Sequence, residues 1–355
     1  MQAFMALLLF PLVWPFVAKR LWNKDITWLE MTLNIAIVIL VVSAVWEVGR
    51  YGKMSDVEIW NGEVTVKEKT SVSCSHSYSC NCRETCSGSG TSRSCSETCD
   101  TCYEHLNDWD WNVSSTAGDF TVDRIDRRGS DEPPRWTRVR INEPVALPHS
   151  FINYIKAAPD SLFHKSSGLE EKQLALLPAY PSVYDYQWIN RVIPVGLALP
   201  EAAEWNTQLA LTLRKLGPAR QVNVIVIVVK TPDQSYVHAL EKHWLGGKKN
   251  DVVVVLGVAE YPKISWAAVM SWTKEELFKV ELRDALIALG HVDNTPVVET
   301  IEKHIAKKFV RRQMKEFEYL KDEIDPPAWA IVLAFLLATV GSIGLSLWFR
   351  KTDVG

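Results

Sequence analysis

The sequence predicts a membrane-anchored α+β protein with three transmembrane helices, a small disulfide-rich β domain and a layered α/β domain. Three apolar segments are separated by a long hydrophilic stretch, and all seven cysteines fall within 29 residues, positions 74–102. Two continuous runs of β-branched residues alternate with amphipathic segments further along the chain. The predicted divisions are an N-terminal helical hairpin (1–50), a β domain (51–148) with a Cys-rich insertion (74–102), a connector rich in Pro and Tyr (149–198), the α/β domain (199–325), and a transmembrane helix with a short tail (326–355).

Two apolar segments, residues 31–46 and 329–349, have the composition of membrane spans. Each is close to the ~20 apolar residues that cross ~30 Å of hydrocarbon, and the second carries Trp near both ends, as expected at the headgroup level. Residues 1–18 are equally apolar but contain two prolines. We expect a first helix that forms a hairpin with the second. The alternative is a long signal sequence cut after Ala44.

Basic residues in the short loops predict the orientation, because such loops stay on the cytoplasmic side. Lys19, Arg20 and Lys24 follow the first segment, and Arg350 and Lys351 follow the last. With three crossings, the N-terminus and residues 50–326 are extracytoplasmic, and the 19–27 loop and the C-terminal tail are cytoplasmic. The lipid bilayer is therefore the first expected partner.

The cysteines are predicted to form disulfides, although their spacing alone does not decide between disulfides and zinc. Only Cys99 and Cys102 form a CxxC pair, and His76 and His105 lie near the two ends of the segment. Export to an oxidising compartment favours pairing. Zinc at the cluster of a cytosol-facing protein is the alternative. Because the number of cysteines is odd, one thiol would remain outside the disulfides. The candidates for disulfide bonding are Cys74, Cys80, Cys82, Cys86, Cys95, Cys99 and Cys102.

Short β segments surround the cysteines. Asn61 and Gly62 have the composition of a type I′ turn and predict a hairpin there. Residues 108–115, 119–126 and 136–141 are expected to form further strands. The Ser/Gly-rich cysteine segment is then an insertion that cannot build its own core, so covalent cross-links would supply its stability. The connector at 149–198 is expected to lie over the surface of the next domain.

The α/β domain is predicted from alternating amphipathic and continuously apolar segments. A continuous β-branched run is typical of a strand that is covered on both faces. The order α-β-α-β-β-α-α makes a small layered domain. Its expected elements are a helix at 200–217 stopped by Gly217 and Pro218, a strand at 222–229, a helix at 233–245, strands at 252–258 and 263–270, and helices at 274–289 and 296–323.

The stretch at 222–258 resembles the TPM domain, in which a buried strand leads into a helix, a Trp-x-Gly turn, a charged stretch and an aliphatic strand. The resemblance covers about residues 199–308, a third of the chain. TPM proteins are often exported and tethered by a terminal membrane helix, and the whole arrangement also looks like uncharacterised membrane proteins of large tailed phages. The matching positions are Tyr236, Ala239, Trp244, Gly246, Lys248, Asn250 and residues 252–256.

Some TPM members are acid phosphatases or metal binders, so the resemblance implies a metal-dependent phosphatase or other hydrolase as one alternative, with a divalent metal in this domain. That chemistry rests on a glycine-containing acidic stretch in the family. This sequence instead reads VMSWTKEELFKVELRDAL, where Glu275, Glu276 and Asp284 stand nearby and the glycines are absent. We therefore assign no catalytic or cofactor-binding residue, and expect no cofactor.

The net charge of −3 excludes a basic, phosphate-tracking surface, so nucleic acid is not an expected partner. We predict a non-enzymatic, membrane-anchored periplasmic or extracytoplasmic protein that binds a protein partner or assists assembly in the envelope, and the resemblance to phage membrane proteins implies that it is phage-encoded. The alternatives are the TPM-like hydrolase and a cytosol-facing zinc-binding membrane protein.

Small residues recur every four positions in the last span and therefore share one helix face. Such a face allows close approach of a second helix in lipid. We expect it to pack against the chain's own hairpin, and a homo-oligomer formed through the last helix is the alternative. The face consists of Ala330, Ala334, Ala338, Ser342 and Ser346.

Overall fold

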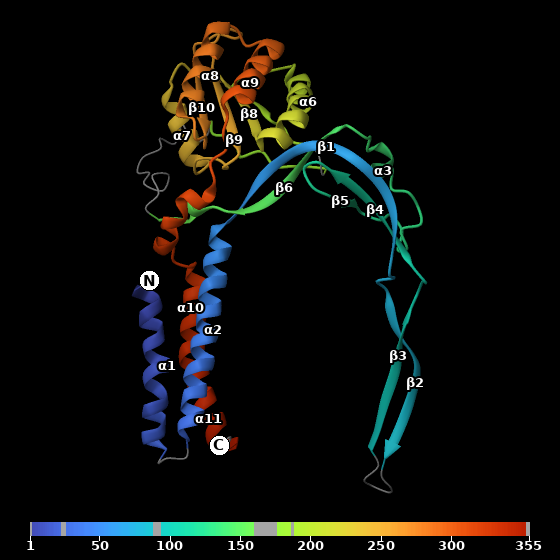
Figure 1. Ribbon diagram of the computed structural model, residues 1–355, viewed down its shortest axis with the longest axis vertical. Helices are drawn as coiled ribbons and strands as arrows, with labels where there is room; N and C mark the ends of the chain where they lie inside the picture. Colours follow the sequence, from blue (N-terminus) through green and yellow to red (C-terminus); the bar gives the residue numbers. More distant parts are fainter. Residues whose placement is uncertain (1, 23–25, 88–93, 160–175, 186–187, 353–355) are drawn as a thin grey trace.

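The computed structural model describes residues 2–22, 26–87, 94–159, 176–185 and 188–352, and confirms an α+β chain. A bundle of long helices lies below an α/β domain, and a curved sheet leads from their junction to a two-stranded ribbon (Figure 1). Lys24 of the predicted cytoplasmic loop and residues 160–175 of the predicted connector lie outside the described residues.

Three helices are long and apolar enough to cross a membrane, as the sequence predicts. The N-terminus lies at the end of the bundle that faces the α/β domain, and the C-terminus lies at the opposite end (Figure 1). The α2 helix starts at a capping box, in which the Thr27 and Glu30 side chains each accept a backbone N–H of the other residue. The helices are α1 (Gln2–Leu21), α2 (Trp28–Met54), and a third formed by α10 (Ala328–Leu336), the π-helical stretch η3 (Leu337–Gly341) and α11 (Ser342–Thr352).

The five small residues of the last helix are buried, and Ala334 and Ala338 pack against Val38 and Val42 of α2. Further along the same contact, the Asn34 side-chain amide donates to the Ser342 carbonyl and the Ser346 hydroxyl, both at 2.9 Å. The Ser342 hydroxyl donates back to the Asn34 carbonyl oxygen at 3.0 Å. Asn34 is a polar residue within the apolar run of α2, and its side-chain amide connects α2 to α11.

Replacing Asn34 with leucine is expected to weaken the association of these two helices. Interhelical hydrogen bonds in an apolar medium contribute about 0.6 kcal/mol on average and up to about 1.7 kcal/mol. Unfolding of the detergent-solubilised full chain would measure the loss, with Thr32→Val as the control on the exposed face of the same helix. Equal stabilities of the two variants would show that the network contributes nothing.

The curved sheet has the strand order β5-β4-β1-β6 and is antiparallel throughout. Its longest strand, β1, begins at the residue directly after α2 and pairs first with β6 and then with β4. Val64, Trp111 and Val113 form its small apolar core. The strands are β1 (Ser55–Val72), β4 (Asp108–Ser115), β5 (Phe120–Val122) and β6 (Pro144–Ile152).

Two local predictions for this region are wrong. Asn61 and Gly62 do not form a hairpin turn, because they pair with β6 in the middle of β1. A glycine is needed there since a Cβ atom would overlap Thr116 and Ala117. The predicted strand at 136–141 is instead the short helix α3 (Pro134–Arg138) and a turn, and the Trp136 ring packs edge-on against Trp111 at 4.7 Å. Short helix α4 (Tyr154–Ala157) follows β6.

The α/β domain is a four-stranded sheet with helices on both faces (Figure 1). Its order is β10-β9-β8-β7, with β7, β8 and β9 parallel and β10 antiparallel. Alternate residues of β8 and β9 pack against α6, α8 and α9 on one face, and against α7 on the other. The elements are β7 (Val192–Val195), α6 (Ala202–Arg220), β8 (Asn223–Val229), α7 (Ser235–His243), β9 (Asp251–Gly257), β10 (Trp266–Ser271), α8 (Glu276–Leu289) and α9 (Asn294–Lys308).

Three details of this domain differ from the predictions. The predicted connector supplies strand β7. Helix α6 continues through Gly217 and Pro218. Gly217 lies where the helix crosses β1, and a Cβ atom at this position would overlap the Asn61 backbone. The predicted helix at 296–323 is broken after Lys308, where Phe309 enters the core, and resumes as a 3₁₀-helix η2 (Met314–Glu323).

Candidate functional site

Six of the seven cysteines form three disulfides across the two strands of the ribbon, β2 (Ser77–Ser87) and β3 (Ser94–Tyr103). The predicted disulfide-rich insertion is confirmed to this extent. The leftover cysteine is Cys74, which is buried. The pairs are Cys80–Cys102, Cys82–Cys99 and Cys86–Cys95, with Cα separations of 5.8, 4.0 and 4.0 Å.

The ribbon has almost no core, since most side chains of β2 are exposed. An isolated two-stranded hairpin is at best marginally stable in water. A disulfide typically adds about 2–4 kcal/mol by restricting the unfolded chain. The three cross-links therefore replace the apolar packing that this segment lacks.

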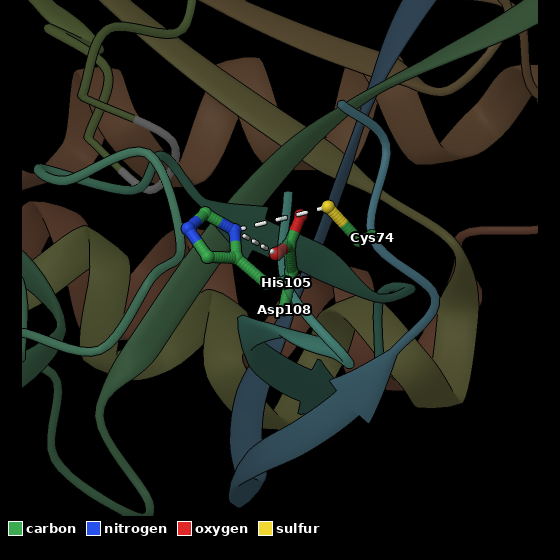
Figure 2. A group of neighbouring side chains, drawn as sticks. All are labelled: Cys74, His105 and Asp108. Carbon is green, nitrogen blue, oxygen red and sulfur yellow. Dashed lines mark hydrogen bonds and ion pairs between the residues drawn. The ribbon is translucent and has the colours of Figure 1, made fainter. Parts of the chain in front are cut away.

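A second cluster lies where the ribbon joins the curved sheet. Cys74 precedes β2, His105 follows β3, and Asp108 is the first residue of β4 (Figure 2). The Cys74 Sγ lies 3.8 Å from His105 Nδ1, and the same nitrogen lies 3.2 Å from Asp108 Oδ1. Asp108 is fully buried and Cys74 is 5% exposed. Sequence spacing did not predict this grouping.

The Asp108 carboxyl is held ionised by its neighbours. Its Oδ2 atom accepts the Ser75 backbone N–H at 3.2 Å and the Arg124 guanidinium at 3.0 Å. Burial opposes ionisation, but these hydrogen bonds outweigh it and place the pKa of Asp108 below its ordinary value. Arg124 also binds Asp110, which fixes its position.

The shape of this cluster does not fit a nucleophile activated by a histidine. Such an arrangement uses both ring nitrogens, one toward the nucleophile and the other toward the acid. In this cluster the thiol and the carboxylate both approach Nδ1. Two further groups of metal-ligating residues in the described chain, Cys82 with Glu97 and Cys99, and Glu84 with Cys86 and Cys95, have their sulfurs in disulfides.

A third polar group joins β1 to the α/β domain. Asp56 accepts a hydrogen bond from Lys248 Nζ at 2.6 Å. The fully buried Glu58 forms ion pairs with Arg311 and with Lys249, the latter at 3.5 Å. Asn61 donates to the Val222 carbonyl at 3.0 Å. These contacts were not predicted, although the acids at 56 and 58 lie on one face of a strand.

Next to this joint, Asp251 is buried at the start of β9. Its carboxyl oxygens accept the Tyr180 hydroxyl at 3.0 and 2.9 Å, the Asn223 amide at 3.0 Å and the Lys248 backbone N–H at 2.8 Å. Burial nevertheless raises the pKa of Asp251 to about 6. The buried site therefore favours the protonated acid.

This pKa predicts a pH-dependent contribution to stability. Between about pH 4 and pH 6 the folded chain keeps a proton on Asp251 that the unfolded chain has lost, so the contribution of Asp251 is present below pH 4 and lost as the pH rises through 6. Relative to Asp251→Asn, the wild type should lose on the order of 2–3 kcal/mol between pH 4 and pH 7. Chemical denaturation at both pH values measures this difference, and parallel pH profiles would contradict it.

The acids that a TPM-like phosphatase could use, which include Asp284 of the acidic stretch and Asp233 just before α7, are not gathered into a site. Asp233 accepts the Ser235 hydroxyl at 2.6 Å, and Asp284 pairs with Arg283 at 2.7 Å. Within the part of the chain that the structure describes, no group of three metal-ligating side chains includes Asp233, Glu275, Glu276 or Asp284.

Comparison with known proteins gives no relative for this chain. The TPM resemblance therefore stays a prediction from the residues alone. No protein family, no characterised protein and no solved structure matches the sequence or the fold.

Proposed function

We propose that this chain is a membrane-anchored extracytoplasmic binding protein that presents the disulfide ribbon to a protein partner in the envelope. The observation that carries the proposal is the continuity of β1. This strand begins directly after membrane-length helix α2, runs for 18 residues without a linker, and ends at the base of the ribbon. Binding is the function that such an arrangement serves most directly.

The position of β1 is fixed on both sides. It is hydrogen-bonded to β6 and β4, and its acids Asp56 and Glu58 form buried ion pairs with the α/β domain. The sheet, the α/β domain and α2 therefore move together. The base of the ribbon is attached to this unit and is therefore held at a defined place relative to the anchor.

The distribution of charge supports an extracytoplasmic position for the ribbon. Lys19 and Arg350 lie near the Trp28 and Trp22 rings, respectively, at the end of the bundle opposite the α/β domain. Basic and aromatic residues of this kind are typical of the cytoplasmic membrane interface. The disulfides are also typical of an oxidising compartment.

The ribbon must stay outside the bilayer. In Figure 1 it extends beside the helices, yet it carries charged residues such as Arg83, Glu84 and Asp100, which are costly to place in hydrocarbon. Residues 73–76 belong to no strand and link the end of β1 to β2. We expect the membrane-bound chain to bend there, so that the ribbon lies on or above the membrane surface.

The α/β domain has buried parallel strands that are covered on both faces, and we propose that it is a TPM-like domain. Export and tethering by a terminal membrane helix, as in many TPM proteins, fit the same proposal. A phage origin would fit a role in remodelling the host envelope. In this account the α/β domain is a rigid support, and its buried Asp251 is structural.

Photo-crosslinking in the native membrane tests this proposal. A photoreactive residue would replace Tyr78 or Tyr103, which are exposed on the ribbon, or Tyr319, which is exposed on η2 and serves as the control. We expect Tyr78 and Tyr103 to yield the same protein adduct, which disappears when the disulfides are reduced in place, and Tyr319 to yield none. Adducts from Tyr319 alone, or metal-dependent phosphatase turnover lost in Asp284→Asn, would overturn it.

A further inference from the structure

We infer that Cys74, His105 and Asp108 form a zinc-binding site at the base of the ribbon. This site goes beyond the proposed binding function, and it differs from a zinc site built from the six ribbon cysteines because those sulfurs are in disulfides. Thiolate, imidazole and carboxylate are the three donor types that zinc takes in proteins.

The donor atoms converge as zinc ligands do. Zinc bonds of ~2.3 Å to sulfur and ~2.0–2.2 Å to nitrogen and oxygen place tetrahedral ligands roughly 3.4–3.6 Å apart. The Cys74 Sγ to His105 Nδ1 distance is 3.8 Å, and the Nδ1 to Asp108 Oδ1 distance is 3.2 Å. All three atoms lie within 4.8 Å of one another. The Cys74 thiol also donates to the His76 carbonyl at 3.5 Å, and an ion placed between the three donor atoms would contact all of them.

The surroundings of Asp108 leave one oxygen for a metal. Ser75 and Arg124 bind Oδ2, while Oδ1 faces His105. Partners of this kind orient a ligand and tune its affinity.

The cluster can be reached from solvent. Cys74 and His105 line a surface hollow of about 560 Å³ together with Tyr103, Glu104 and Leu106. An ion can therefore enter, and the hollow leaves its fourth position open to water. His76, whose Nδ1 lies 3.9 Å from Asp108 Oδ2, stands at the other side of the carboxylate.

Zinc at this position would join the two chains of the ribbon's base. Cys74 belongs to the segment between β1 and β2, while His105 and Asp108 belong to the return from β3 into β4. The ion would hold these two segments of the base together, and the ribbon beyond them could still turn away from the helices. The ion would also keep Cys74 out of disulfide exchange with the six paired cysteines.

The test uses the full chain purified without reductant, with any affinity tag removed. We expect about one zinc per chain by elemental analysis, and a thiolate-to-metal charge-transfer band after replacement with Co²⁺. Cys74→Ser should abolish the band, and His105→Gln should weaken zinc binding by more than the roughly 10–100-fold typical of an outer-shell change. His238→Gln, an exposed histidine on α7, is the matched control and should keep both.

A measurement on the unaltered protein guards against variants that fold poorly. Zn²⁺ should slow alkylation of the Cys74 thiol, and a chelator should restore the original rate. Alkylation that is equally fast with and without Zn²⁺ would overturn the inference. Zinc content that is unchanged in Cys74→Ser would overturn it as well.

Discussion

Replacing Glu58 with glutamine is expected to lower the free energy of unfolding of the full chain by about 3–5 kcal/mol. Glu58 is fully buried in β1 and faces Arg311 and Lys249, whose side chains are 10% and 16% exposed. Removing one partner of a buried ion pair leaves the other charges buried without compensation, and this cost is the source of the expected loss of about 3–5 kcal/mol, which is what such losses typically amount to. The Trp60 indole N–H, which donates to Glu58 at 2.9 Å, would keep an acceptor in glutamine.

Glu281→Gln is the matched control for this change. Glu281 pairs with Lys308 on the surface of the α/β domain, where its side chain is 43% exposed. Exposed ion pairs contribute roughly 0–1 kcal/mol because water and salt screen them. Denaturation of both variants in detergent gives the comparison. A Glu58→Gln variant as stable as Glu281→Gln would show that β1 is not held to the α/β domain by these charges.

The second large effect is expected at Trp205, where substitution by alanine should cost about 3–5 kcal/mol. Trp205 is fully buried at the first turns of α6 and belongs to the same apolar cluster as Phe278 of α8. Its removal would leave a cavity that the surrounding helices and strands can only partly fill.

Two controls separate packing from helix propensity at this site. Leu211→Ala lies on the exposed side of the same helix and should change the stability by no more than about 0.5 kcal/mol. Trp205→Phe should lose much less than Trp205→Ala, since the indole N–H of Trp205 has no hydrogen-bond partner among the described residues. Similar losses for Trp205→Ala and Leu211→Ala would contradict the assigned core.

The elements that the sequence predicts well are those with a strong local pattern. The helices long enough for a membrane follow from long, predominantly apolar composition, and β8 and β9 follow from continuous β-branched runs. Each of these segments is apolar enough to determine its own conformation. The predicted α+β class therefore needed no knowledge of distant contacts.

The predictions that are wrong concern residues whose role depends on distant parts of the chain. Asn61 and Gly62 have the composition of a turn, but Gly62 lies against Thr116 and Asn61 binds the α/β domain. Gly217 has the composition of a helix stop, but it lets α6 cross β1 closely. In each case tertiary contact determines the structure, and a local pattern cannot contain that information.

The candidate site was predicted only in part. Six cysteines in a short polar segment indicate disulfides, but their connectivity depends on strand register, here with Cys86 opposite Cys95. Cys74 and Asp108 come together because Val72 pairs with Asp108 at the end of β1. That pairing joins positions 36 residues apart and has no short sequence signature.

Peptide mapping of the full chain, alkylated in the native membrane and digested without reductant, tests the central claim most directly. The account predicts the pairs Cys80–Cys102, Cys82–Cys99 and Cys86–Cys95, with Cys74 as the thiol outside them. This pattern would place the ribbon in an oxidising compartment, as an extracytoplasmic binding element requires. Seven reduced, alkylated cysteines would instead place the ribbon in the cytosol and contradict the proposed topology and function.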